Sequence, residues 1–62
     1  MKFIKLTDLT DNGIMFFNVL QIIYIEKSVS EGTVIATNYM GLIYVKETPE
    51  EILQKIKEAE SE

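Results

Sequence analysis

The hydrophobic pattern of this chain changes its period once, at Thr48, and that change limits the possible folds more than any other feature. Upstream, apolar residues occur in short runs, several of which alternate with polar residues, as in half-buried strands. Thr48 is followed by Pro49 and, three positions after the cap, by Glu51. This is a capping box with proline at the first helical position. The sequence therefore predicts one helix, over about residues 49–60, preceded by strands.

The apolar side chains of the predicted helix fall on one stripe, made of Ile52, Leu53, Ile56 and Ala59. We expect this stripe to cover one face of a sheet, and the alternative is a role in binding a groove on another protein.

Five runs upstream are predicted to be strands, and Asn12-Gly13 supplies the positive φ angles that favour a tight turn between the first two. The expected fold class is α+β, a small antiparallel β-meander of four to five strands followed by one C-terminal helix. We expect a single domain over residues 1–62, with all strands within 2–46. The predicted strands are 2–7, 14–18, 20–27, 33–37 and 42–46.

The stretch 15–25 is too apolar for a sheet with one solvated face, because its only polar residues are Asn18 and Gln21. Simple alternation places Met15 and Phe17 on one face and Phe16 on the other. The same rule sets Ile23 and Ile25 against Ile22 and Tyr24, and Ile43 and Val45 against Leu42 and Tyr44.

Two structures would explain this pattern. Either the sheet curls around a core and leaves scattered apolar residues outside, or its second face is buried against another copy. We expect the second, although alternation alone does not say which face lies inside. The candidate interface residues are Met15, Phe16, Phe17, Ile22, Tyr24 and Tyr44.

The chain is short enough to need additional stabilisation, since a domain of about 60 residues buries only about 60% of the surface exposed on unfolding. Its 62 residues include neither cysteine nor histidine. Disulfides are therefore excluded, and a zinc or copper site made of carboxylates alone is improbable. Homo-oligomerisation is the expected supplement.

The net charge of −4 arises entirely from residues 47–62, because lysines and acids balance over 1–46 and arginine is absent. A neutral body with an acidic tail argues against binding nucleic acid or anionic membranes. The charged start, with Lys2 and Lys5, does not resemble an export signal. The apolar stretch is too short to span a membrane. We expect a cytoplasmic protein.

No residue pattern predicts catalysis, a cofactor or a metal site. Asp8, Thr10 and Asn12 resemble the start of a calcium loop, but the position that requires a bidentate glutamate is Val19. The serines and threonines lack a neighbouring base, and the three glycines occur singly rather than in a phosphate-binding loop. The sequence therefore indicates a non-enzymatic protein.

Several segments resemble the FlbD-type flagellar and swarming motility proteins, which are small bacterial proteins. The similarity covers residues 4–7 (IKLT), Asn18 with the later Ile25-Glu26, residues 33–38 (TVIATN) and residues 44–52 (YVKETPEEI). The family usually has Asn-Gly directly after the fourth strand, whereas this chain has a longer NYMG turn. The resemblance implies an accessory role through protein contacts, linked to motility and without catalytic activity.

A second resemblance leads to a different class of function. The length and the order of five strands and a helix are similar to RNA-binding regulators of the carbon-storage type, which bind RNA through basic residues at strand edges. Here the stretch before the helix offers Lys46 followed by Glu47, and no arginine. RNA binding is therefore kept as the alternative function.

Overall fold

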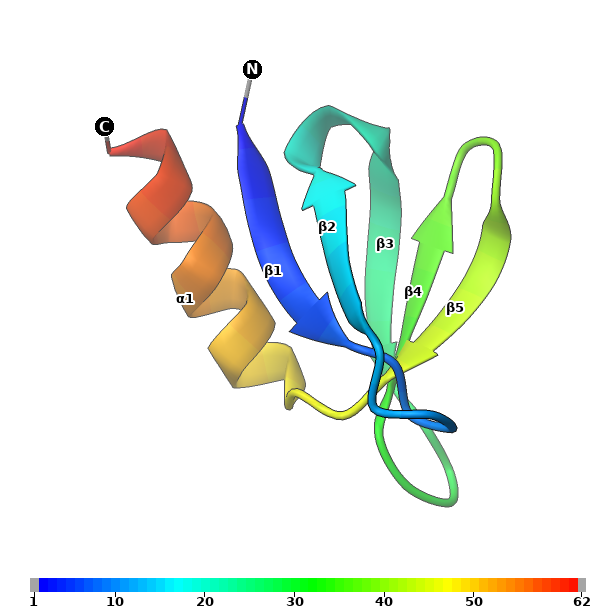
Figure 1. Cartoon of the computed structure of the whole chain (residues 1–62). Helices are drawn as coiled ribbons and strands as arrows, with labels where there is room; N and C mark the ends of the chain where they lie inside the picture. Colours follow the sequence, from blue (N-terminus) through cyan, green and yellow to red (C-terminus); the bar gives the residue numbers. More distant parts are fainter. Residues whose placement is uncertain (1, 62) are drawn as a thin grey trace.

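The computed structural model describes residues 2–61, so Met1 and Glu62, the ends of the expected domain, lie outside the described residues. It confirms the α+β class, with five antiparallel strands followed by one C-terminal helix (Figure 1). The elements are β1 (Phe3–Thr7), β2 (Ile14–Asn18), the 3-10 turn η1 (Val19–Gln21), β3 (Ile22–Lys27), β4 (Thr33–Thr37), β5 (Gly41–Val45) and α1 (Pro49–Glu60).

The strands form two sheets rather than one continuous meander. β1 pairs with β2, and β3, β4 and β5 form a second sheet in that order. The sheets join at one corner, where Asp8 bridges to Val45 and the Lys46 N–H donates to the Thr7 carbonyl over 2.9 Å. This corner brings the end of β1 against the end of β5, so the chain curls around a shared core.

The break between the sheets begins at Asn18. Its Oδ1 accepts the Leu20 N–H over 3.0 Å and caps η1, which occupies the start of the predicted strand 20–27. That strand begins instead at Ile22. An asparagine side chain competes well for local backbone donors, which is why it ends β2 here.

A bulge in β3 overturns the alternation expected for this strand. The register with β4 shifts between Ile22 and Tyr24, and an extra residue at such a shift moves the following side chains to the opposite face. Ile22 and Ile25 consequently pack against the core, whereas Ile23 and Tyr24 are exposed. The prediction that Ile23 and Ile25 share a face was wrong.

The core lies between the two sheets and the helix. Its buried hydrophobic residues are Ile4, Leu6, Phe17, Ile35, Val45 and Ile52. Helix α1 packs against β1 and β3 (Figure 1).

Only part of the predicted helix stripe faces this core. Ile52 is fully buried, and Ile56 and Ala59 pack against the core. Leu53, by contrast, is 59% exposed. One residue along a helix turns the side chain by about 100°, which carries Leu53 off the buried face.

The entry to α1 is held by two sets of hydrogen bonds. The predicted capping box is present, with the Glu51 N–H donating to Thr48 Oγ1 over 3.1 Å and the Thr48 N–H donating to Glu51 Oε1 over 2.8 Å. Just before it, Thr7 donates its N–H and its hydroxyl to the two carboxylate oxygens of Glu47, each over 2.9 Å. The Thr33 hydroxyl donates to the Glu47 carbonyl. These contacts anchor the strand-to-helix connection to both sheets.

Within residues 2–61, α1 has 12 residues and no helix has the length and apolar character required to cross a membrane.

Candidate functional site

The six predicted interface residues divide into two groups in the structure. Phe17 is 5% exposed in the core, and Met15 and Ile22 pack against that core. Phe16, Tyr24 and Tyr44 are exposed. The alternation predicted for β2 and β5 is therefore confirmed, and it assigns the two groups to opposite faces of their sheets.

The outer face of the three-stranded sheet carries an apolar surface, which we call the outer sheet patch. Its members are Tyr24, Val34, Ala36, Leu42 and Tyr44. Ala36 pairs with Tyr24 on one side and Leu42 on the other, and Val34 pairs with Tyr44. Val34 and Ala36 alternate with the core residue Ile35 and therefore point away from the core.

Val34 and Ala36 are nevertheless only 8% and 5% exposed. The large side chains of Tyr24, Leu42 and Tyr44 flank them in register and cover them, while about half of each large side chain remains exposed. Cross-strand neighbours on one face pack in this way. The result is an apolar surface with one acid on the same face, Glu26, which flanks Val34 in register.

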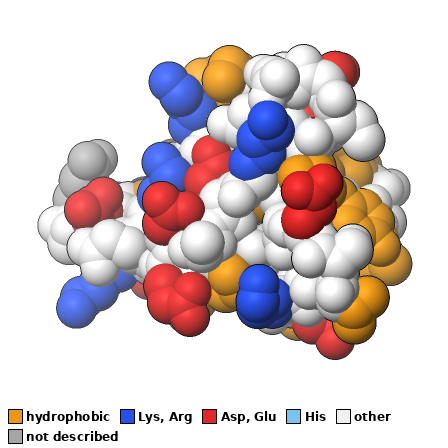
Figure 2. All heavy atoms as spheres, turned by 90° about the horizontal axis from the view of Figure 1, so that it is seen from below, with side chains coloured by type: hydrophobic (Ala, Val, Ile, Leu, Met, Phe, Trp, Pro, Cys, Tyr) orange, Lys and Arg blue, Asp and Glu red, His pale blue; other side chains and the backbone are white. Residues whose placement is uncertain are grey.

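Figure 2 shows how charged and hydrophobic side chains are distributed on one face of the molecule. Seen from below, hydrophobic side chains gather along the side that carries β4 and β5, whereas most lysines and acids lie over the α1 side and the middle (Figure 2). This separation gives the β4–β5 side the character of a contact surface rather than of a generic solvated face.

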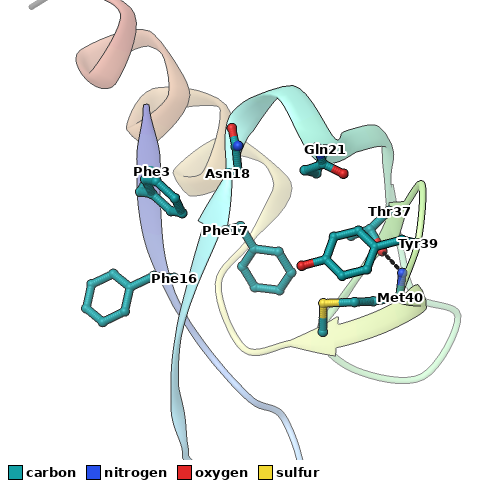
Figure 3. Close-up of a pocket in the computed structure, with 8 residues that line it drawn as sticks. All are labelled: Phe3, Phe16, Phe17, Asn18, Gln21, Thr37, Tyr39 and Met40. Carbon is teal, nitrogen blue, oxygen red and sulfur yellow. Dashed lines mark hydrogen bonds between the residues drawn. The ribbon is translucent and has the colours of Figure 1, made fainter. Parts of the chain in front are cut away.

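A second apolar feature lies along β2, and we call it the edge notch. It is a cavity of about 270 Å³ between β2 and the β4–β5 turn. In Figure 3 the side chains of Tyr39 and Met40 extend from that turn toward Phe17. The lining residues are Phe3, Phe16, Phe17, Asn18, Gln21, Thr37, Tyr39 and Met40.

The position of the notch follows from its lining. Phe16, Phe17 and Asn18 are consecutive in β2, and successive side chains of a strand point to opposite faces. A single cavity that touches all three must lie at the edge of the strand rather than on one face.

No signal in the sequence places the turn 38–40 opposite β2, because this proximity depends on how the two sheets curl. Phe3 and Met40 were consequently absent from the predicted interface.

The titratable groups with shifted pKa values lie outside both surfaces. Hydrogen bonds from the Thr10 hydroxyl and N–H lower the pKa of Asp8. Burial pushes the pKa of Glu47 upward, but hydrogen bonds from Thr7 and from its own backbone, together with the charge of Lys55, outweigh burial and lower it. Both shifts come from contacts that stabilise loops.

The turn that resembles a calcium loop is closed by its own residues. Asp8 Oδ1 accepts the Thr10 N–H over 2.8 Å and the Thr10 hydroxyl over 2.6 Å, and Asn12 adopts a φ of 62°. Across residues 2–61, no three acidic side chains converge as a metal site would require.

Comparison with protein-family models, curated proteins and solved structures found no match.

Proposed function

We propose that this chain is a non-enzymatic accessory protein of the bacterial cytoplasm, that it acts through protein contacts, and that it self-associates through the outer sheet patch. The observation that carries the proposal is the apolar surface that Tyr24, Leu42 and Tyr44 build over Val34 and Ala36. The resemblance to FlbD-type proteins supports an accessory role connected with motility.

The exposed area supports a dimer of modest affinity. Tyr24, Leu42 and Tyr44 each expose about half of their surface, and large side chains of this kind present roughly 150–250 Å² each, so together they offer roughly 300 Å². A standard interface buries about 800 Å² on each partner. The patch would therefore form the apolar centre of an interface, with polar residues such as Glu26 at its rim.

The corresponding free energy can be estimated from this area. Burying roughly 600 Å² of apolar surface across a twofold pair contributes about 15 kcal/mol, and association costs about 4–15 kcal/mol. A cost near the middle of that range leaves about 5–7 kcal/mol, equivalent to a Kd of roughly 10–200 µM.

A second copy is a suitable partner because Tyr24, Leu42 and Tyr44 carry no charge, and the one acid on this face, Glu26, would stay at the rim. A patch on a C2 axis must be complementary to itself, and a row of tyrosine and leucine side chains meets this requirement. Self-association would also supply stability that a domain of this size lacks.

The test is light scattering behind size exclusion from about 1 µM to about 1 mM, which spans the expected Kd. We expect the mass to rise toward two or more chains, and Leu42→Asp to keep the protein monomeric throughout. The matched control is Leu53→Asp, because Leu53 has similar exposure but lies on α1. A monomer at every concentration, or equal loss of association in both variants, would refute the proposed interface.

A further inference from the structure

Two of the edge strands, β2 and β3, differ in how their open edges are protected. β3 is one edge of its sheet and carries a bulge, with Glu26 and Lys27 near its end. β2 pairs only with β1, in a regular register, and contains no charge, proline or bulge. Bulges and charges are the usual means of preventing strand pairing at an edge. β2 lacks them, so its edge remains competent to pair.

The backbone direction at this edge follows from the hydrogen bonds of Thr7, which pairs with Ile14. Thr7 directs its N–H to Glu47 and its carbonyl to Lys46, and therefore away from β2. In an antiparallel ladder such outward-directed pairs alternate with hydrogen-bonded pairs. Phe16, two residues along from Ile14, consequently directs its N–H and carbonyl away from β1 and toward the open edge.

The other end of the hairpin fits the same alternation of hydrogen-bonded and outward-directed pairs, because the Val19 N–H donates to the Lys2 carbonyl over 2.9 Å.

The edge notch lies beside these backbone groups. Its volume of about 270 Å³ is below the roughly 300–1,000 Å³ typical of small-molecule pockets. Phe17, Tyr39 and Met40 supply apolar walls, and the side-chain amides of Asn18 and Gln21 lie at its border (Figure 3). The notch is suited to one large apolar side chain that projects from a paired backbone.

The notch also distinguishes between a single chain and a second folded copy. Tyr39 and Met40 stand across from Phe17, so the edge of β2 is recessed (Figure 3). The β2 edge of another copy would be recessed in the same way, and two such edges do not meet. A single extended segment needs only the backbone edge of β2 and room for one side chain, which the notch supplies.

The charges of the β1–β2 hairpin define the partner further. The only charged residue within β1 and β2 is Lys5, which pairs with Phe16, and Lys2 directly precedes β1. None of the residues lining the notch is charged. A segment with acidic residues beside its apolar side chain would complement these two lysines.

We propose that the open edge of β2 binds an extended acidic segment of a partner protein, which pairs with the backbone of Phe16 and inserts one large apolar side chain into the edge notch. This is strand addition with a side-chain pocket. The proposal rests on the proposed role in protein contacts but not on self-association through the outer sheet patch.

The test uses a blocked nine-residue peptide of alternating valine and threonine, with a central phenylalanine and an aspartate at each end, titrated into the 15N-labelled full chain. We expect a Kd below about 1 mM, with the amide signals of Phe16 and Asn18 moving and Phe16 gaining protection from exchange. Replacing both aspartates of the peptide by lysine weakens binding severalfold at low salt, and added salt reduces the difference.

Two variants examine the two halves of the site. Met40→Asp places a charge in the notch and weakens binding at least tenfold, whereas Leu53→Asp leaves it unchanged. Phe16→Pro removes an N–H that points to the open edge together with a side chain that lines the notch, so Phe16→Ala, which removes the side chain alone, is its control. Both proteins should still fold, and binding should fall at least tenfold further for Phe16→Pro than for Phe16→Ala.

Absence of binding at millimolar peptide, equal binding by Met40→Asp, or signal changes confined to the outer sheet patch would overturn the proposal. The proposal would also be overturned if, without peptide, the protection of the Phe16 amide rose with protein concentration, because the occupant of the edge would then be a second copy. The Leu42→Asp protein separates the two functions. It should bind the peptide with unchanged affinity, and peptide binding by a protein that never self-associates would refute only the outer sheet patch.

Discussion

Gly32 is the position where a single added methyl group most directly tests how the two sheets are joined. Its φ is +80°, and a Cβ there would lie 2.6 Å from the carbonyl oxygen of Val45 and 3.1 Å from a methyl carbon of Leu9. Val45 forms the bridge to Asp8 at the corner between the sheets. Gly41 provides a matched control, because its φ is +78° but a Cβ there meets nothing within 4 Å.

The two glycines allow the expected loss of stability to be separated into a backbone part and a steric part. An alanine in the left-handed region costs about 1–2 kcal/mol, and both Gly32→Ala and Gly41→Ala incur this cost. Gly32→Ala additionally forces the Val45 backbone or its own loop to move, which at typical overpacking penalties costs about 1–3 kcal/mol more. A domain of this length has a total stability of roughly 3–9 kcal/mol. Gly32→Ala should therefore remove a large fraction of it.

Urea unfolding followed by circular dichroism measures both variants, at one low protein concentration so that self-association does not contribute. We expect the midpoint to fall substantially further for Gly32→Ala than for Gly41→Ala. Equal losses would show that the close approach of Gly32 to Val45 does not constrain the protein and that the corner between the sheets is not tightly joined.

Three further results are expected. Ile52→Ala should lower the free energy of unfolding by about 2–5 kcal/mol because it leaves a cavity. Leu53→Ala should change that free energy by less than about 0.5 kcal/mol. Similar losses for the two variants in urea unfolding would contradict the observed orientation of α1. Glu47 has a folded pKa below its ordinary value of 4.5, so its stabilising contribution is present above pH 4.5 and is lost as the pH falls through the folded pKa. Glu47→Gln should flatten the pH dependence of the melting temperature in that acidic range and nowhere else. A labelled RNA pool should show no gel shift at low salt, and a shift that weakens steeply with salt would instead favour the RNA-binding alternative.

Local sequence was sufficient where a structure depends on residues a few positions apart. The helix start at Thr48, Pro49 and Glu51 could be predicted because a capping box is formed by neighbouring groups. The opposite faces of Phe16 and Phe17 followed from the geometry of a regular strand. The α+β class followed from the single change of period.

The tertiary structure decided what depends on distant pairing. The bulge that puts Tyr24 on the outer face and Ile25 on the core exists only in the register between β3 and β4, and the curl of the sheets places Met40 beside β2. Alternation identified two apolar faces, but burial of Phe17 and exposure of Tyr44 were settled by the packing of both sheets and α1 around one core. Contacts between residues far apart in the chain are not encoded in any short window of sequence, so the sequence alone determined the elements, whereas the tertiary structure determined which surfaces remain available to a partner.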